Sequence, residues 1–295
     1  MPAALPTIAF VGAGAIGLPM AQRLIAADFP TTGVDPFPAA QERARTAGVA
    51  MVGALSDVEA PDIVIVMVAT PDQLETLIDD AAATLSGRPA TWVIMSTVGP
   101  EAVTAAATRL AETGARVVDA PVTGGVARAR TGELTIFTSG DPEAVALVTP
   151  ALSAMGVVRT VGDAPGRGQA VKVVNQHLCS VHIVAAAEAL ALTEKLGLDP
   201  AEILPLLESG AAGSWMLSDR GPRMLEGTEV EVASQISIFV KDAGLVATAA
   251  RDADAATPLL DIAQERFTAA AAAGLARRDD SRVIETYTHP QEQSQ

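Results

Sequence analysis

The sequence predicts an α/β protein with an N-terminal doubly wound sheet and an all-α C-terminal domain built on one long helix. Three observations support this prediction. Short β-branched runs alternate with Ala-rich helical stretches through the first half of the chain. After Gly168 the chain runs to Leu196 without a Pro or Gly, as a single long helix would. Every later segment has a helical pattern.

The first half contains seven strand-like runs separated mainly by five helical stretches. The strands are expected at Ile8–Val11, Gly33–Asp35, Ile63–Val68, Trp92–Met95, Arg116–Asp119, Leu134–Thr138 and Val157–Val161. The helices are expected at Ile16–Ala27, Ala39–Thr46, Gln73–Leu85, Glu101–Glu112 and Pro142–Met155. Strands that alternate with helices in this way form βαβ units. We therefore expect a mostly parallel sheet, helices on both of its faces and right-handed crossovers.

The second half begins with the long helix, which at ~1.5 Å per residue is roughly 40 Å long. Gly197 is placed to end this helix, and Asp199 with Pro200 is placed to open the next one. We therefore expect two domains, residues 1–165 and residues 166–295. A helix that is apolar on most sides is not covered by one small domain, so we expect a homodimer or homotetramer.

Composition excludes several classes of protein. The 295 residues carry a net charge of −15, which argues against binding to nucleic acid or to an acidic membrane surface. No apolar run approaches the ~20 residues that span a bilayer. Residues 1–6 have no basic region ahead of an apolar stretch, so we expect no signal peptide. The only cysteine, Cys179, fits a reducing compartment, and we expect a soluble cytoplasmic protein.

A glycine-rich motif follows the first strand and opens a helix, with the sequence Gly12-Ala-Gly14-Ala15-Ile16-Gly17. The first glycine permits a tight turn, the second leaves room for a pyrophosphate, and the third allows close packing of helix and sheet. The N–H groups at the start of the helix would bind the phosphates. A simple turn is the alternative interpretation of such a loop, but the strand, the loop and the helix all match a dinucleotide site.

Asp35 ends the second strand, where dinucleotide-binding sheets place an acid. A carboxylate there accepts hydrogen bonds from the ribose hydroxyls and repels a 2′-phosphate. The sequence therefore predicts NAD as cofactor, in preference to NADP.

A second motif contains Thr123, Gly124 and Gly125 after a strand that ends at Asp119. Two adjacent glycines expose consecutive N–H groups, and such a nest beside a hydroxyl suits a carboxylate or another small anion. A flexible loop at the strand end is an equally good interpretation of this pattern alone.

A third motif lies at the start of the long helix. Lys172, Asn175, Gln176 and Cys179 are spaced to share one helix face. Only three of the 20 basic residues are Lys, and this one lies among valines in the first turn, where the helix dipole disfavours a cation. Burial would also lower the pKa of Lys172, so that it could exchange a proton near pH 7. The alternative is a lysine whose charge reaches solvent.

Lys241 follows an apolar pair on a C-terminal helix and precedes Asp242. It could reach a cofactor or form a surface ion pair with Asp242. The cysteine and the three His residues have no metal-ligand spacing, so we predict no metal. No G-x-S-x-G motif indicates a serine hydrolase.

Taken together, these motifs resemble the β-hydroxyacid dehydrogenase family, which includes 3-hydroxyisobutyrate dehydrogenase and tartronate semialdehyde reductase. The resemblance extends over nearly the whole chain. It implies an NAD-binding Rossmann domain in residues 1–165 and a helical substrate and oligomerisation domain in residues 166–295. The segments Val181–Ile183, Ala211–Met216 and Asp279–Ser281 are most similar to the L-threonate dehydrogenase branch, which acts on four-carbon sugar acids.

The resemblance also implies roles for individual residues. Lys172 matches the catalytic lysine. The cofactor would be bound by the glycine-rich loop together with Val68, Ala69, Thr97 and Lys241. The substrate carboxylate would lie on Thr123, Gly124 and Gly125, with help from Ser96. The family typically has two Asn residues at the third and fourth positions after the lysine, whereas this chain has Asn175 and Gln176.

The expected activity is NAD-dependent oxidation of a small β-hydroxy acid at a CH–OH group. Neutral Lys172 would take the alcohol proton, and Asn175 would orient the reacting oxygen. We expect a threonate-like substrate, with 3-hydroxyisobutyrate dehydrogenase or tartronate semialdehyde reductase as the alternative. An imine reductase shares the architecture but normally lacks the lysine. A non-catalytic dinucleotide sensor is the alternative from another class.

Overall fold

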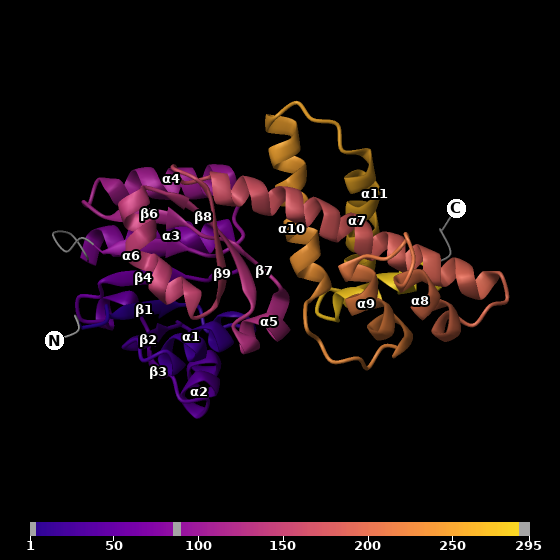
Figure 1. Cartoon of the computed structure of the whole chain (residues 1–295), viewed down its shortest axis with the longest axis horizontal. Helices are drawn as coiled ribbons and strands as arrows, with labels where there is room; N and C mark the ends of the chain where they lie inside the picture. Colours follow the sequence, from indigo (N-terminus) through magenta and orange to yellow (C-terminus); the bar gives the residue numbers. More distant parts are fainter. Residues whose placement is uncertain (1–3, 85–89, 289–295) are drawn as a thin grey trace. The chain divides into compact units, whose positions relative to one another are not determined.

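A computed structural model describes residues 4–84 and 90–288 of the chain (Figure 1). The chain divides into two compact units, Met1–Lys172 and Val173–Gln295. Unit 1 is α/β and unit 2 is helical, so the predicted fold class is confirmed. None of the described helices is long and apolar enough to cross a bilayer.

The sheet of unit 1 has the strand order of a Rossmann fold. From one edge the strands follow β3-β2-β1-β4-β5-β6, the doubly wound order, and every neighbouring pair among these six is parallel. Their bounds are β1 Ile8–Val11, β2 Thr31–Val34, β3 Ala50–Val52, β4 Ile63–Val66, β5 Thr91–Ile94 and β6 Arg116–Asp119. Six parallel strands bring six carboxyl ends to one edge, where ligands bind in such sheets.

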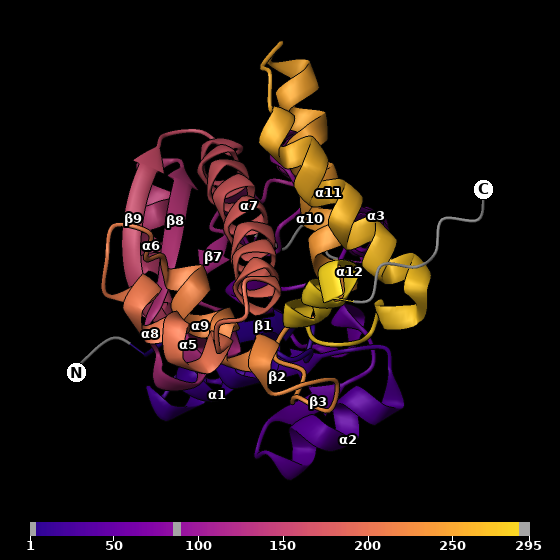
Figure 2. The same cartoon turned by 90° about the vertical axis from the view of Figure 1, so that its right-hand side faces the viewer.

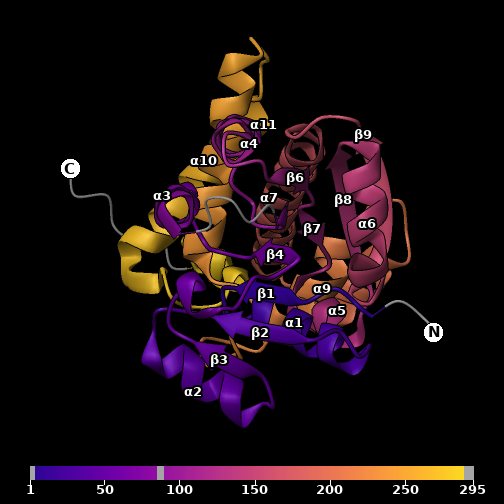
Figure 3. The same ribbon diagram turned by 90° about the vertical axis from the view of Figure 1, so that its left-hand side faces the viewer.

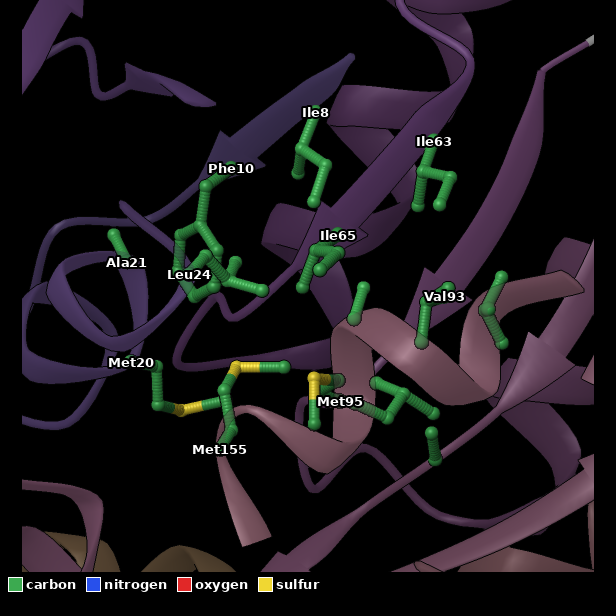
Figure 4. Packing of buried hydrophobic residues seen from close by; sticks show 14 of the residues in the cluster. Ile8, Phe10, Met20, Ala21, Leu24, Ile63, Ile65, Val93, Met95 and Met155 are labelled. Carbon is green, nitrogen blue, oxygen red and sulfur yellow. The ribbon is translucent and has the colours of Figure 1, made fainter. Parts of the chain in front are cut away.

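Helices cover both faces of the sheet. On one side lie α3 (Pro71–Thr84) and α4 (Pro100–Ala111), and on the other lie α1 (Gly17–Ala26) and α6 (Pro142–Ser153), as Figure 3 shows. Residues of β1 alternate between the two resulting cores, since Phe10 packs into one and Val11 into the other. Figure 4 shows the packing around Phe10. Burial on both faces explains why β1 and β4 are continuous apolar runs without polar alternation.

The sheet is mostly parallel, as predicted, and it is mixed only beyond β6. Strand β8 (Leu134–Gly140) is antiparallel to β6 and to β7 (Val122–Thr123), and it is parallel to β9 (Gly156–Gly162). The two-residue β7 is too short to carry a hydrophobic period. Strand β3, which has three residues, and helix α5 (Gly125–Thr131), which begins at the second of two adjacent glycines, were not predicted.

The remaining predictions for unit 1 agree with the structure to within a few residues. Helix α2 spans Pro38–Thr46, and the strands at Ile8 and Arg116 have the predicted bounds. Strand β4 ends at Val66, so Val68 lies in the loop beyond it. The predicted end of the third helix, Leu85, lies outside the described residues.

The long predicted helix is present as α7 (Arg167–Lys195), and the boundary between the units falls within it. Gly197 follows with a φ of 76°, the left-handed conformation that ends helices. Asp199 then caps α8 (Pro200–Glu208) by accepting a hydrogen bond from Ala201 N at 2.8 Å. Both predicted boundaries are confirmed.

Unit 2 packs its other helices around an apolar core. These are α9 (Trp215–Leu225), α10 (Ile236–Asp252), α11 (Pro258–Ala270) and the short α12 (Glu285–Thr288). Helices α10 and α11 lie side by side (Figure 2), and the rings of Phe239 and Phe267 stack with centroids 5.1 Å apart. Arg220 forms two hydrogen bonds, of 3.0 and 2.8 Å, with the buried carboxylate of Asp280, which fixes the C-terminal segment to α9.

Candidate active site

The glycine-rich loop after β1 has the geometry of a phosphate-binding turn. Gly12 has a φ of 99°, and a Cβ there would lie 2.3 Å from Met67 O. A Cβ at Gly17 would lie 2.0 Å from Gly12 O. Close packing therefore requires both glycines. A Cβ at Gly14 would have no atom within 4 Å, so the exposed side of this loop is open.

The start of helix α1 is available to a ligand. Ala15 is exposed and Ile16 is half-buried, and no side chain caps the N-terminus of α1. The first N–H groups of a helix carry a partial positive charge, which suits a pyrophosphate. The open Gly14 and the uncapped helix therefore fit a dinucleotide.

Asp35 holds this loop from the end of β2. Its Oδ2 accepts a hydrogen bond from Ala13 N at 2.9 Å, and its Oδ1 accepts one from Phe37 N at 3.0 Å. An ionised carboxylate has about four acceptor positions, so the two main-chain bonds leave capacity for ribose hydroxyls. Asp35 is thus part of the loop's architecture as well as a predicted cofactor contact.

Val68 and Ala69, predicted to line the nicotinamide side, lie after β4. Val68 N donates to Ser96 Oγ at 2.7 Å, and Ala69 N donates to Gln73 Oε1 at 2.8 Å. Ser96 is fully buried. Because its hydroxyl is engaged by the main chain, Ser96 holds Val68 in place, and this geometry does not support the direct substrate contact that we expected from it. Thr97 follows in the same loop.

A buried network that sequence reasoning missed joins β6 to the start of α7. Asp119 Oδ2 accepts hydrogen bonds from Gly166 N at 3.0 Å, from Gln169 N at 2.9 Å and from Ser139 Oγ at 3.2 Å. Burial raises the pKa of Asp119, and the hydrogen bonds from Gln169, Gly166 and Ser139 oppose that shift. A carboxylate at this place interacts favourably with the N-terminus of α7.

Gln169 extends the network to the loop after β5. Its Nε2 donates to Ser96 O at 2.9 Å and to Asp119 Oδ1 at 3.1 Å. Its Oε1 accepts from Val98 N at 3.1 Å and from Gly99 N at 3.0 Å. One carboxamide thus ties together the ends of two strands and the first turn of a helix. Two sequence signals could have indicated this network. They are the acid at the end of a strand, Asp119, and the glutamine at the start of a helix, Gln169.

Lys172 follows Gln169 by three residues, so it lies one turn along α7 on nearly the same face. It is 6% exposed, which confirms the predicted burial. The network of Asp119 and Gln169 therefore fixes the turn of helix from which the Lys172 side chain extends.

The predicted substrate segment lies at β7 and the start of α5. Thr123 is the last residue of β7, and Gly124 and Gly125 have φ values of 129° and 69°. A Cβ at Gly124 would lie 2.9 Å from Arg128 Cδ, whereas Gly125 has no atom within 4 Å of a Cβ position. Two consecutive left-handed residues account for the paired glycines. The segment leads directly into a helix, where we had considered a flexible loop.

Unit 2 carries the other predicted residues. Gln176 and Asp242 are buried, at 7% and 4% exposure. Gln176 Nε2 donates to Asp242 Oδ2 at 2.5 Å, and Lys241 Nζ lies 2.9 Å from Asp242 Oδ1. Asn175 Nδ2 donates to Gln176 Oε1 at 2.9 Å. Lys241 forms an ion pair with Asp242, as one of the two alternatives predicted. The pair is not at the surface, because the Asp242 carboxylate is buried.

Family comparisons agree with this geometry. A family model described as the NAD binding domain of 6-phosphogluconate dehydrogenase matches residues 7–162, more than half of the chain. A second model, described as NAD-binding of NADP-dependent 3-hydroxyisobutyrate dehydrogenase, matches residues 166–287. The chain belongs to the β-hydroxyacid dehydrogenase family. The resemblance inferred from its motifs is confirmed, and its cofactor is a nicotinamide dinucleotide.

Individual relatives cover almost all of this β-hydroxyacid dehydrogenase. L-threonate dehydrogenase of Cupriavidus necator is 38% identical over 284 residues, which are 95% of each chain. 2-Hydroxy-3-oxopropionate reductase of Escherichia coli is 31% identical and is matched over 94% of this chain and 96% of its own. The crystal structure of 3-hydroxyisobutyrate dehydrogenase from Salmonella typhimurium has a TM-score of 0.86 at 31% identity, covering 95% and 99% of the two chains. The protein is therefore an oxidoreductase that uses a nicotinamide dinucleotide and acts on a hydroxyl group.

Replacing Gln169 tests the buried network. Gln169→Met keeps the length of the side chain but removes its hydrogen bonds, and each buried group left without a partner costs about 1–3 kcal/mol. We expect the free energy of unfolding of unit 1 to fall by roughly 3 kcal/mol in total. The measurement is urea unfolding followed by tryptophan fluorescence in a Trp215→Phe background. The chain has two Trp residues, so the remaining one, Trp92, reports on unit 1 alone.

Gln22→Met is the matched control, because the exposed Gln22 makes one hydrogen bond, to Ala47 O at 3.0 Å. It should change stability by about 0.5 kcal/mol or less. Equal effects of the two substitutions would contradict the central role of Gln169.

Proposed function

We propose that this enzyme oxidises a polyhydroxylated acid of about four carbons, similar to threonate, using NAD. The observation that carries the proposal is the full-length similarity to L-threonate dehydrogenases, at 38% identity for the Cupriavidus necator enzyme. The chemistry of the predicted lining supports it, since Thr123, Asn175 and Gln176 are polar. A polyol needs hydrogen-bonding partners, whereas a methyl-bearing acid needs an apolar wall.

The residues of the segment Ala211–Met216 differ in how far they support a polyhydroxylated substrate. Trp215 is 46% exposed, with Arg220 5.7 Å from its ring, so it is available to cover a sugar chain. Met216 is 8% exposed and belongs to the core of unit 2. Ser214 Oγ accepts a hydrogen bond from Leu217 N at 3.0 Å and caps α9. The proposed contribution of this segment to specificity therefore rests on Trp215.

In the proposed reaction Lys172 is the general base. NAD, when bound, accepts the hydride that leaves the hydroxyl-bearing carbon. Neutral Lys172 takes the alcohol proton on Nζ, and in the reverse direction it returns that proton to the carbonyl oxygen. Thr123, Gly124 and Gly125 hold the substrate carboxylate, and Asn175 is predicted to orient the reacting oxygen. The carboxylate and the hydroxyl together fix the carbon that reacts.

Two other functions remain as alternatives. The relatives named 3-hydroxyisobutyrate dehydrogenase and 2-hydroxy-3-oxopropionate reductase favour an acid with three carbons or a methyl branch. A dinucleotide sensor without activity would need the Gly12 loop but would have no chemical use for a buried lysine beside Asn175.

Substrate choice is tested by comparing kcat/KM for L-threonate, D-erythronate, D-glycerate and 3-hydroxyisobutyrate with NAD. We expect a polyhydroxylated acid to be preferred, because unpaired polar groups in a closed site are costly. A tenfold preference for 3-hydroxyisobutyrate, about 1.4 kcal/mol in transition-state binding, would reject the polyol proposal. Turnover of none of the four acids would indicate a hydroxy acid outside this panel as the substrate.

Lys172 is tested by two substitutions. Lys172→Ala should lower kcat by about 10²–10⁴, the usual contribution of general acid–base catalysis, while the Kd for NADH changes little. Lys172→Arg should not restore turnover, because Arg stays protonated at any accessible pH. Retention of most of the kcat by the Arg variant would instead indicate an electrostatic role.

We propose that NAD is preferred to NADP because the Asp35 carboxylate would face a 2′-phosphate. Asp35→Asn should lower the NAD-to-NADP ratio of kcat/KM by about fivefold or more, since roughly 1 kcal/mol of charge repulsion is removed. Asp72→Asn, at an exposed position on α3, is the control. A wild-type enzyme that favours NADP would overturn the proposal.

We propose that α7 is buried by a second copy of this chain. The exposed fractions of Val174, Leu178 and Leu192 are 64%, 48% and 56%, and their spacing places them along one stripe of the helix. Light scattering at micromolar concentration should give a dimer or tetramer. Val174→Glu with Leu178→Glu should lower the mass, whereas Val157→Glu, at an exposed apolar position on β9, should not. A monomeric wild type would contradict this proposal.

A further inference from the structure

A chain of hydrogen bonds in unit 2 connects α10 to the face of α7 that carries Asn175. It begins at Asp242, whose Oδ1 lies 2.9 Å from Lys241 Nζ and whose Oδ2 accepts from Gln176 Nε2 at 2.5 Å. It continues through Gln176 Oε1, which accepts from Asn175 Nδ2 at 2.9 Å. Asn175 Nδ2 also lies 3.3 Å from Cys179 Sγ.

The carboxylate at one end sets the direction of every bond in this chain. An ionised carboxylate only accepts hydrogen bonds, so the NH2 group of Gln176 must face Asp242. The carbonyl oxygen of Gln176 then faces Asn175 and accepts from it. Both hydrogens of the Asn175 amide are directed to Gln176 and Cys179, which leaves its carbonyl Oδ1 to face a ligand.

We propose that Asp242 is a positioning residue that makes Asn175 an acceptor toward substrate. Acting through Gln176, it fixes Asn175 with Oδ1 presented to the bound acid. Asn175 then accepts a hydrogen bond from a substrate hydroxyl that does not react, in place of the contact with the reacting oxygen that the resemblance implies. The proposal rests on the proposed function, because it assigns the binding of a second hydroxyl group to that same site.

The proposal accounts for the burial of a carboxylate among amides. An isolated Asn or Gln can exchange its oxygen and nitrogen by rotation, and its role as donor or acceptor is then not fixed. A buried carboxylate removes this freedom, since the reversed orientation would place a carbonyl oxygen against Asp242. A methyl group at the position of the second hydroxyl would leave Asn175 Oδ1 without a donor, which is the kind of mismatch that gives strong discrimination.

The first experiment measures discrimination against fluorine, which has nearly the size of a hydroxyl but cannot donate. The substrates are L-threonate and the two derivatives in which fluorine replaces one of the two hydroxyl groups that do not react, and the measured quantity is the ratio of kcat/KM. In wild type we expect about tenfold preference for the hydroxyl at one of the two positions. In Asp242→Asn the ratio should fall below about threefold, because Gln176 and Asn175 can then reverse.

The control for this substitution is Asp252→Asn, which changes an exposed acid at the end of the same helix. It should keep the wild-type ratio. An unchanged ratio in Asp242→Asn, with active enzyme, would overturn the inference and leave the proposed function standing. Failure of the wild type to oxidise L-threonate would instead count against the proposed function, and the second experiment then decides the role of Asp242.

The second experiment is the pH profile of Gln176→Glu, measured with the best acid of the four-substrate panel. The introduced acid in its protonated form donates to Asp242 and accepts from Asn175, as Gln176 does. In its ionised form it faces the Asp242 carboxylate, and this repulsion together with burial raises its pKa. Lys241 on α10 pairs with Asp242 and opposes the shift. Lys172, His177 and Cys179 are the other titratable groups near Gln176 along α7.

We expect kcat/KM of Gln176→Glu to fall about tenfold as the pH rises through one ionisation that wild type lacks. Adding Asp242→Asn should move that ionisation to lower pH, because the neighbouring negative charge is gone. A profile parallel to wild type, or an ionisation that the second substitution does not move, would overturn the positioning role of Asp242.

Discussion

The buried junction of Asp119 and Gln169 is the contact on which the rest of unit 1 depends. It joins the end of β6, the loop after β5 and the first turn of α7 through hydrogen bonds of 2.9–3.1 Å. Gly168 makes this approach possible, because a Cβ there would lie 2.5 Å from Phe137 O. Lys172 is one turn further along the same helix, so a structural contact and a proposed catalytic group share one rigid segment.

Five of the first six strands could be predicted, because burial on both faces leaves a strong signal in strands such as β4. Strand β3 has three residues and is too short to show a pattern. Runs such as Ile63–Val66 are apolar throughout and are separated by amphipathic helices. Beyond β6, strands β8 and β9 were predicted, but β7 lacks that signal. Strand β7 has two residues, and its antiparallel pairing depends on the return of β8, which is a tertiary contact with no local pattern.

Residues of the candidate site could be predicted where the residue type and its position together indicate a single role. The spacing of Gly12, Gly14 and Gly17 serves a close turn and a phosphate, and a lysine among valines is costly without a function. Ser96 and Gln176 were harder, because a hydroxyl or an amide can bind substrate or main chain equally well. Only the structure places Val68 N beside Ser96 and Asp242 beside Gln176. Those neighbours are distant in sequence, so spacing gave no indication of them.

Helices α1 and α7 begin in different electrostatic situations. The start of α7 receives the carboxylate of Asp119, whereas no side chain caps α1. The N–H groups at the start of α1 are not bound by a capping side chain, and a bound pyrophosphate would supply an anion there. Such a ligand binds the folded chain and not the unfolded one. Each tenfold rise in its concentration above Kd therefore raises the free energy of unfolding by about 1.4 kcal/mol. The cofactor is in this sense a structural component of unit 1, and the lifetime of the folded protein depends on the dinucleotide pool around it.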